Sequence, residues 1–505
     1  MPAIILTTIN ARYIHASLGL RWLYANLGDL QPQACIQEYT LTDQISDMAE
    51  KILASMPRVV GIGVYIWNAL QVRQLVGILK RVAPETVVVL GGPEVSHMPL
   101  RVDLSEADYL IQGEGEATFA ELCWAILAQQ PPQERIIRAE SLAVENLASP
   151  YPFYTEEDLA HRLIYVEASR GCPFRCEFCL SSIDRRVRPF DIDWFLAEME
   201  TLWQRGARTF KFVDRTFNAN PATALRILDY FLEKTAPFHV HFEVIPDHFP
   251  EAVKERLARF PAGTLQLEVG IQTLDPQIAA NISRRLDFDR IRENLAFLER
   301  ETTAHLHVDL IVGLPGESIE QFGRNLNTLI MLAQGEIQIG ILKKLSGTAI
   351  NRHDQVYGMV YSPDSPYEIL KNDLISFAQM QEMKRLARFW DLIYNSGNFR
   401  RSAPLLWEGS DVFTGFSAFS RWLYGQTLAT WQIGLPRLSE LLFFYLVEEK
   451  GMAKSAVADS LAADILVIKG RVLPKTVQAH VTQAPEERRS LGESLTKRQK
   501  RHRQD

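Results

Sequence analysis

Three of the five cysteines, Cys172, Cys176 and Cys179, lie within eight residues of one another. Their spacing, Cys-x3-Cys-x2-Cys, allows one short loop to place three thiolates around a small inorganic cluster. A [4Fe–4S] cluster has four irons, so three cysteine ligands leave one iron open for a substrate or cofactor. Cys35 and Cys123 lie far away in the sequence, on a predicted strand and a predicted helix, so we do not expect a fourth protein ligand.

A single zinc ion is the main alternative at these cysteines. A tetrahedral zinc site needs a fourth cysteine or a histidine close by, and the sequence has none at a suitable spacing. Five cysteines in 505 residues also do not make a disulfide scaffold. The cysteine pattern therefore favours an iron–sulfur cluster over zinc and over a chance group of buried thiols.

A series of alternating strand and helix patterns surrounds the cysteine loop. Strands are predicted at residues 163–167, 209–213, 239–244, 264–270, 305–312 and 336–342. Helices are predicted at residues 193–205, 221–235, 250–260, 289–300 and 318–333. Six such units indicate a partial (β/α)6 TIM-like barrel, and the cysteines follow its first strand, at the carboxyl end where barrel active sites lie.

An earlier alternating series precedes the barrel. Strands rich in Val and Ile are predicted at residues 3–8, 34–39, 59–64, 86–90 and 109–111, which indicates a doubly wound, Rossmann-like parallel sheet. Gly91, Gly92 and Gly113 fall at the carboxyl ends of these strands, where such sheets bind ligands. Because no Gly-x-Gly-x-x-Gly follows the first strand, a dinucleotide is not favoured.

The domain boundaries follow from these patterns. We expect an N-terminal α/β domain at residues 1–135, a proline-containing linker at 136–160 and the barrel at 161–360. A mainly helical region at 361–483 and a flexible basic tail at 484–505 complete the chain. The tail is expected to be solvated, with weak RNA contact as a less favoured alternative.

Composition narrows the classes of partner. The net charge of −7 gives no bulk basic field for nucleic acid. Apolar runs fall far below the ~20 residues of a membrane span, and the N-terminus lacks the features of a signal peptide. We therefore expect a cytoplasmic protein that binds neither membranes nor large nucleic acids.

The barrel motifs resemble those of radical S-adenosylmethionine (SAM) enzymes. Cys172, Cys176 and Cys179 match the cluster ligands of that family. Segments 212–218, 268–274 and 309–317 read FVDRTFN, EVGIQTL and DLIVGLPGE and resemble the SAM-contacting strands, although the first departs from the usual Gly-Gly-Glu. The resemblance implies a SAM-binding set of Phe178, Asp214, Glu268, Gln272, Gly313 and Gly316.

The N-terminal domain resembles the cobalamin-binding domain of one subclass of these enzymes. The matching segments contain Gly91 and Gly92, and then Gly113 and Glu114. The Asp-x-His-x-x-Gly loop, which supplies a histidine ligand in other cobalamin proteins, is missing after the first strand. His15 stands in its place, where it either ligates cobalt or packs against the loop, and many members of the subclass have no protein ligand.

This resemblance implies an activity. A reduced [4Fe–4S] cluster, supplied with electrons by a donor such as flavodoxin or ferredoxin, would cleave SAM to methionine and a 5′-deoxyadenosyl radical. Cobalamin would then deliver a methyl group to an unactivated carbon of a small-molecule substrate. This requires the barrel mouth to face the carboxyl edge of the N-terminal sheet.

Three alternatives compete with a methyltransferase. The first is an oxidative cyclase or rearrangement enzyme of similar layout, such as a tetrapyrrole cyclase. The second is a non-catalytic cobalamin-responsive binding protein, which would not need the cysteine loop. A methylthiotransferase is disfavoured because a second group of three cysteines is missing. The C-terminal region resembles an extension found in relatives of unassigned function, and its aromatic residues are expected to form a helical core rather than a substrate pocket.

Overall fold

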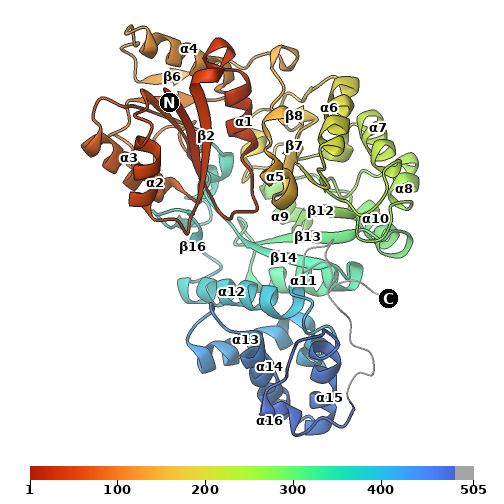
Figure 1. The fold of residues 1–505 in the computed structure, drawn as a ribbon. Coiled ribbons are helices and arrows are strands. Elements are labelled where there is room, and N and C mark those ends of the chain that lie inside the picture. The colour runs from red at the N-terminus through yellow and green to blue at the C-terminus, as the bar shows by residue number, and fades with distance from the viewer. Residues whose placement is uncertain (484–505) are drawn as a thin grey trace. The chain divides into compact units, whose positions relative to one another are not determined.

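The computed structural model describes residues 1–483, which form two compact units (Figure 1). The first unit comprises Met1–Arg215, Lys343–Asn351 and Tyr361–Glu368. The second comprises Thr216–Leu342, Arg352–Val360 and the chain from Ile369 onward. The cysteine loop lies in the first unit, together with the whole N-terminal sheet.

The N-terminal sheet has six parallel strands in the order β2-β1-β3-β4-β5-β6. The strands are β1 (Ile4–Asn10), β2 (Ala34–Thr40), β3 (Val59–Gly63), β4 (Val87–Gly91), β5 (Tyr109–Gln112) and β6 (Ile136–Arg138). The strand order reverses between β1 and β3, which is the switch point where open α/β sheets bind ligands. This confirms the predicted doubly wound domain.

Helices cover both faces of this sheet. They are α1 (Leu18–Ala25), α2 (Ile45–Leu53), α3 (Ala69–Val82) and α4 (Glu116–Leu127). Side chains of β1 alternate between two buried clusters, because successive strand residues point to opposite faces. Ile5 and Ile9 pack in the cluster with α2 and α3, whereas Ile4 and Leu6 pack in the cluster with α1 and α4.

The structure differs from the sequence-based domain division at the predicted linker. Ile136–Arg138 forms β6 and pairs with β5, and Glu156–His161 forms helix α5 behind a capping box of Thr155 and Asp158. A three-residue strand is too short to show a periodicity, and the neighbouring Pro131 and Pro132 indicate a loop. Backbone pairing to β5 is what makes this segment a strand.

A buried ion-pair network ties the N-terminal sheet to the chain that follows it. Arg21 pairs with Glu38 (3.1 Å) and Asp158 (2.6 Å), and Arg162 pairs with the same two carboxylates (2.8 and 3.1 Å). Trp22 of α1 stacks on Phe190, with 5.5 Å between the ring centroids. These contacts fix the first barrel strands within the same unit as the sheet.

The first unit also contains the start of the predicted barrel. Its remaining elements are β7 (Ile164–Val166), β8 (Ser169–Arg170), β9 (Arg188–Pro189), α6 (Ile192–Gln204) and β10 (Thr209–Phe212). Strands β7 and β10 pair in parallel, with Phe210 opposite Ile164. Strands β8 and β9 pair antiparallel and frame the loop that carries the cysteines.

The second unit continues the alternation with four parallel strands in the order β14-β13-β12-β11. These are β11 (His239–Val244), β12 (Leu265–Gln272), β13 (His305–Val312) and β14 (Glu336–Ile341). The accompanying helices are α7 (Pro221–Leu232), α8 (Glu251–Leu257), α9 (Pro276–Asn281), α10 (Phe288–Glu301) and α11 (Ile319–Leu332). With β7 and β10 they supply the six strands of the predicted partial barrel.

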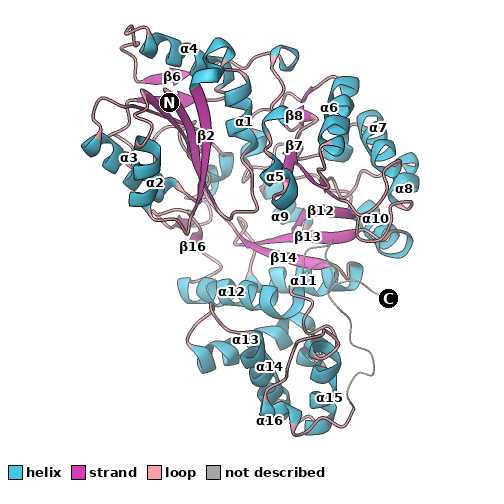
Figure 2. Ribbon diagram, viewed as in Figure 1, coloured by secondary structure: helices cyan, strands magenta, loops and turns pink. Residues whose placement is uncertain are grey.

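The C-terminal region is helical, as predicted, and Figure 2 shows helices throughout the chain after β16. Its helices are α12 (Phe377–Trp390), α13 (Val412–Thr427), α14 (Leu435–Phe444), α15 (Lys454–Ile465) and α16 (Lys475–Gln478), preceded by short strands β15 (Val360–Tyr361) and β16 (Ile369–Lys371). Phe389, Trp390 and Phe399 are fully buried, so these aromatic side chains form core. Within residues 1–483, no helix is both long and apolar enough to cross a membrane. The predicted basic tail, residues 484–505, lies outside the described residues.

Candidate functional site

The cysteine loop begins directly after β8. The Cys172 N–H donates to the Asp184 carbonyl at 3.0 Å, and the Cys179 N–H donates to the Cys176 carbonyl at 3.1 Å. Gly171 has a φ of +89°, and a Cβ on it would lie 2.2 Å from the Arg186 carbonyl oxygen. Only glycine can therefore start this loop as it is folded.

The thiol of Cys172 is buried and interacts electrostatically with its neighbours. Burial raises the pKa of Cys172, and the neighbouring Cys179 and Cys176 raise it further, while the charge of Arg215 lowers it. A buried thiol that resists deprotonation loses its proton when a cationic centre binds the sulfur, as metal binding does. The donor set therefore fits a cationic cluster.

The arrangement favours a cluster over a single zinc ion. Three side chains can share one ion when their ligand atoms all lie within 4.8 Å of one another. Among residues 1–483, the three cysteines do not form such a group. Ligands that share one ion must lie that close, whereas ligands of a four-iron cluster bind different irons.

Asp214, predicted to lie near SAM, holds the strand that leads into the cysteine loop. Its Oδ2 accepts from the Ala168 N–H (2.9 Å) and its Oδ1 from the Ser169 hydroxyl (2.6 Å). Burial raises the Asp214 pKa to about 6. Both carboxylate oxygens thus position the chain ahead of Cys172, and direct SAM contact by Asp214 stays a prediction.

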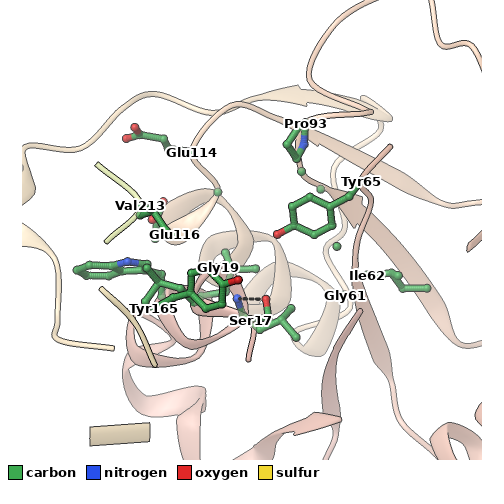
Figure 3. Close-up of a pocket in the computed structure, with 18 of the residues that line it drawn as sticks. Ser17, Gly19, Gly61, Ile62, Tyr65, Pro93, Glu114, Glu116, Tyr165 and Val213 are labelled. Atoms are coloured by element: carbon green, nitrogen blue, oxygen red, sulfur yellow. Dashed lines mark hydrogen bonds between the residues drawn. The ribbon is translucent and has the colours of Figure 1, made fainter. Parts of the chain in front are cut away.

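A cavity of about 730 Å³ opens in the first unit at the carboxyl edge of the N-terminal sheet (Figure 3). The predicted cobalamin residues His15, Gly91, Gly92, Gly113 and Glu114 all line it. The residues that follow β7 and β10 line it as well, namely Glu167, Arg170, Val213 and Arg215. Within this unit, residues that follow the first barrel strands therefore lie at the same cavity as the carboxyl edge of the N-terminal sheet.

The cavity walls fit a large, flat cofactor. A Cβ on Gly91 would meet no atom within 4 Å, so the backbone of Gly91 is exposed to the cavity. Gly92 and Gly113 have φ values of +104° and +97°, which glycine adopts without strain. Tyr65 also lines the cavity and stacks on Trp67 with a 6° angle between the rings, which gives the wall a planar aromatic surface.

His15 lies in the cavity wall with a hydrogen bond of its own. Its Nδ1 is 2.7 Å from the Tyr165 hydroxyl. Burial lowers the His15 pKa, and the charges of Lys211, Arg12 and Arg162 lower it further. The ring is therefore neutral at pH 7, the form that can ligate a metal, so packing and cobalt ligation both stay possible roles for His15.

A charged network joins the cavity wall to the cysteine loop. Arg170, two residues before Cys172, pairs with Glu116 (2.8 Å), Glu167 (3.0 Å) and Glu114 (3.5 Å). Burial raises the Glu167 pKa to about 7, and Arg170 counteracts that rise. Sequence reasoning missed Arg170, Glu116 and Glu167, although Arg170 lies beside the cysteines and Glu116 ends the glycine motif, which is the GEGE segment at residues 113–116.

The other predicted SAM residues lie in the second unit, on β12 and after β13. Glu268 Oε2 is 3.1 Å from His241 Nε2, and Gln272 has a φ of +70° where β12 is irregular. Gly313 and Gly316 have φ values of +90° and +83° and form the turn after β13. Their role toward SAM, like that of Phe178, stays a prediction.

Glu317, next to Gly316, is fully buried and makes stability depend on pH. Its Oε1 accepts from Thr273 (3.1 Å) and Asn325 (2.9 Å), and burial raises its pKa to about 8. The unfolded chain releases this proton near its ordinary pKa of about 4.3. The folded state thus loses stability relative to the unfolded state as pH rises from about 4.5 through 8.

We expect Glu317→Gln, which mimics the protonated carboxyl, to remove this loss. Urea unfolding at pH 5 and pH 9 should show the variant near wild type at pH 5 and more stable than wild type at pH 9. Glu255→Gln, at an exposed position, should follow wild type at both pH values. A variant that is less stable than wild type at pH 9 would contradict the assignment.

Comparison with known proteins supports this reading of the fold. Residues 4–123 match the B12 binding domain, and residues 166–329 match the radical SAM superfamily. The first match covers β1–β5 and most of α4, and the second contains the cysteine loop. Residues 355–504 match a family described as a protein of unknown function (DUF4080).

Two curated relatives are methyltransferases by name. An uncharacterized methyltransferase of Pyrococcus horikoshii is 24% identical over 60% of this chain and 71% of its own length. The 2-(S-pantetheinyl)-carbapenam-3-carboxylate methyltransferase of Streptantibioticus cattleyicolor is 25% identical over 63% of this chain and 51% of its own length. The chain thus spans about half the length of the second relative.

Among solved structures, the cobalamin-dependent SAM radical enzyme OxsB, with aqua-cobalamin and S-adenosylmethionine bound, has a similar fold. The TM-score is 0.62 at 13% sequence identity, and the match covers 91% of this chain and 78% of that one. The matches agree with the site geometry. The cysteine loop lies within the radical SAM match, and the glycines of the cavity lie within the B12-binding match. The chain thus carries a B12-binding domain ahead of a radical SAM domain.

Proposed function

We propose that this protein is a cobalamin-dependent radical SAM methyltransferase that methylates an unactivated carbon of a small molecule. The single observation that carries the proposal is the cavity of the first unit. Its walls combine the glycine-rich carboxyl edge of the N-terminal sheet with Arg170, which precedes the cysteine loop, and Arg215, whose charge acts on Cys172. Cobalamin in this cavity would lie beside the cluster loop.

Different residues of the first unit would bind the cluster and the cobalamin. Cys172, Cys176 and Cys179 would hold the [4Fe–4S] cluster. Gly91, Gly92 and Gly113 would line the cobalamin, with His15 at the same wall. When bound, the reduced cluster supplies the electron that cleaves SAM, and cobalamin supplies the methyl group that is transferred.

The chain's own residues would position these groups. Asp214 fixes the chain ahead of Cys172, and the Arg170 network fixes the same segment against the cavity wall. Arg215 lines the cavity and acts electrostatically on Cys172, so its positive charge would stabilise the reduced state of a cluster held there. Flavodoxin or ferredoxin is the proposed electron donor.

A small molecule is the proposed substrate class. The net charge of −7 disfavours a large nucleic acid, and the relative from S. cattleyicolor is named for a carbapenam carboxylate. The reaction would give S-adenosylhomocysteine from the methyl-donating SAM and 5′-deoxyadenosine from the SAM that forms the radical.

The products of SAM separate this proposal from its alternatives. The protein is reconstituted without oxygen with iron, sulfide and cobalamin, reduced, and incubated with SAM, and both nucleosides are measured by mass spectrometry. A methyltransferase gives 5′-deoxyadenosine and S-adenosylhomocysteine, and the second product disappears when cobalamin is omitted. 5′-Deoxyadenosine alone would indicate a cyclase or rearrangement enzyme, and neither product would indicate a non-catalytic binding protein.

A substitution at Gly91 tests the cobalamin cavity separately from the cluster. The large side chain of Gly91→Trp would enter the cavity, because nothing lies within 4 Å of the Cβ position. We expect cobalamin affinity to fall at least tenfold, which corresponds to a loss of about 1.4 kcal/mol or more of binding free energy. Iron content should not change. Equilibrium dialysis measures the affinity.

Two further variants complete the Gly91 series. Gly91→Ala should fall between wild type and Gly91→Trp. Gly425→Leu adds a large side chain at an exposed position of α13 and should bind cobalamin as wild type does. Wild-type affinity in Gly91→Trp would place the cofactor elsewhere.

A further inference from the structure

One face of the sheet in the second unit carries a group of histidines. Alternate residues of β11 and β13 are histidines on this face: His239 and His241, and then His305 and His307. Glu336, the first residue of β14, lies beside the β13 pair and is buried, with 1% of its side chain exposed. The group lies at the amino ends of β13 and β14, in the second unit, whereas the cysteine loop belongs to the first.

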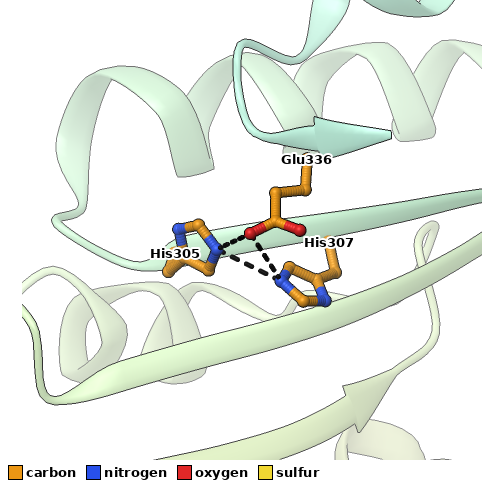
Figure 4. A group of neighbouring side chains, drawn as sticks. All are labelled: His305, His307 and Glu336. Atoms are coloured by element: carbon orange, nitrogen blue, oxygen red, sulfur yellow. Dashed lines mark hydrogen bonds and ion pairs between the residues drawn. The ribbon is translucent and has the colours of Figure 1, made fainter. Parts of the chain in front are cut away.

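Three of these side chains converge on one point (Figure 4). His305 Nε2 is 2.9 Å from Glu336 Oε1 and 3.1 Å from His307 Nε2. The third side of the triangle, from His307 Nε2 to Glu336 Oε1, is 3.4 Å.

Protons alone cannot satisfy this triangle. Each imidazole nitrogen has a single in-plane position, which holds either one proton or one lone pair. Two nitrogens can therefore make at most two of the three contacts as hydrogen bonds. If both nitrogens donate to Glu336, two N–H groups face each other across 3.1 Å.

A metal ion at the centre satisfies all three atoms at once. Zinc binds histidine nitrogen and carboxylate oxygen at about 2.0–2.2 Å, so ligands at tetrahedral angles lie about 3.3 Å apart. The observed separations of 2.9, 3.1 and 3.4 Å scatter around that value. Two histidines and one glutamate are also a known zinc donor set that leaves one position for water.

The surroundings support the ligands. The side-chain nitrogen of Gln266 on β12 lies 3.3 Å from His307 Nδ1 and 3.4 Å from His307 Nε2, so Gln266 packs against the edge of this ring, and a partner at Nδ1 can orient the ring of a metal-bound histidine. The Gln266 amide can present its oxygen to an Nδ1–H by a half-turn, because its oxygen and nitrogen are interchangeable by rotation.

We propose that His305, His307 and Glu336 bind one divalent transition-metal ion, zinc first, at a site distinct from the cysteine loop. The ion would join the first residues of strand β13 to the first residue of strand β14. Imidazole and carboxylate ligands suit zinc and related first-row ions, whereas the thiolates of the cysteine loop suit an iron–sulfur cluster. The site does not depend on the proposed methyltransferase activity.

The test uses the full-length protein with its cluster reconstituted. The protein is treated with a chelator, its iron is measured, and it is then dialysed against a range of Zn²⁺ concentrations. Mass spectrometry of the elements counts zinc and iron in the same sample. We expect one zinc per chain, with iron content unchanged.

Variants and spectroscopy identify the ligands. The isosteric Glu336→Gln should weaken zinc binding at least tenfold, and Gln266→Ala should weaken it about 10- to 100-fold, as loss of an orienting partner does. His248→Ala removes a histidine of the same unit outside the group and should bind zinc as wild type does. X-ray absorption of the bound zinc should show nitrogen and oxygen neighbours near 2.0–2.1 Å and no sulfur near 2.3 Å.

Each result decides the proposal. Sulfur neighbours would place the zinc on the cysteines, and wild-type zinc affinity in a folded Glu336→Gln would remove Glu336 from the site. Absence of bound zinc in folded wild-type protein would overturn the proposal outright. None of these outcomes alters the yields of 5′-deoxyadenosine and S-adenosylhomocysteine, so failure of the zinc site and failure of the methyltransferase proposal are separable.

Discussion

Cys176→Ala is expected to lose the iron–sulfur cluster and, with it, all cleavage of SAM. The variant leaves two thiolates for a cluster that needs three protein ligands, while the alanine keeps the carbonyl that accepts the Cys179 N–H. The loop can therefore keep its backbone and still fail to hold iron. Iron content should fall from about four per chain to near zero, and 5′-deoxyadenosine should fall to the background of protein without iron.

The matched control is Cys35→Ala. Cys35 lies on β2 of the N-terminal sheet, is half-buried, and belongs to the same unit as the cysteine loop. This variant removes a thiol of equal size and should keep full iron content and SAM cleavage. Normal iron content in Cys176→Ala would show that the cysteine loop is not the cluster site.

Arg170→Ala is expected to cause the largest loss of folding stability among the cavity residues. The Arg170 side chain is 10% exposed and neutralises Glu116 and Glu167, whose side chains are 9% and 11% exposed. Removing one partner of a buried ion pair leaves uncompensated charge and typically costs about 3–5 kcal/mol. Urea unfolding should show a decrease of this size, and cobalamin retention should fall because Glu116 and Glu114 line the cavity.

The pH dependence of the Arg170 effect provides an internal check. Burial raises the Glu167 pKa to about 7, and loss of Arg170 removes the largest influence that lowers it. Glu167 is protonated at pH 5 and then carries no buried charge, so the loss of stability should be smaller at pH 5 than at pH 8. Adding Glu167→Gln to Arg170→Ala should recover part of the loss.

The control for Arg170 is Arg186→Ala in the same loop. The Arg186 side chain is 78% exposed, and exposed ion pairs contribute little, so the change should stay within about 0.5 kcal/mol. An Arg170→Ala protein as stable as Arg186→Ala would refute the structural role of the network.

Long, regular elements could be predicted well from the sequence. The strands predicted at residues 239–244 and 305–312 agree with β11 and β13 residue for residue. A proline-containing turn follows each of them, with Pro246 after β11 and Pro315 after β13, and both strands contain β-branched or aromatic side chains, which local propensity identifies. The three-residue β6 was missed because its conformation depends on pairing with β5, a contact that the sequence pattern does not show.

The candidate site was predictable where short sequence spacing creates it. The cysteines act through one loop, so their spacing alone indicates the chemistry. The Arg170 network joins residues 54 to 56 positions apart, on the glycine motif and on the strand before the cysteine loop, and only the fold brings them together. The sequence does contain a pattern typical of the proposed zinc ligands, because His-x-His within a strand places both rings on one face.

Asp214 shows why a family motif does not fix a role. The segment FVDRTFN matches a SAM-contacting segment in position, yet both oxygens of Asp214 accept hydrogen bonds from residues 168 and 169. A departure from the usual motif residues thus coincides with a structural use of the acidic side chain.

The most direct test of the central claim is a count of both cofactors on one protein. The wild-type chain is purified without oxygen, reconstituted with iron, sulfide and hydroxocobalamin, and desalted. Cobalamin and iron are then quantified per chain. We predict about four irons and one cobalamin retained together, whereas iron without cobalamin, or cysteines that hold zinc or no metal, would contradict the account.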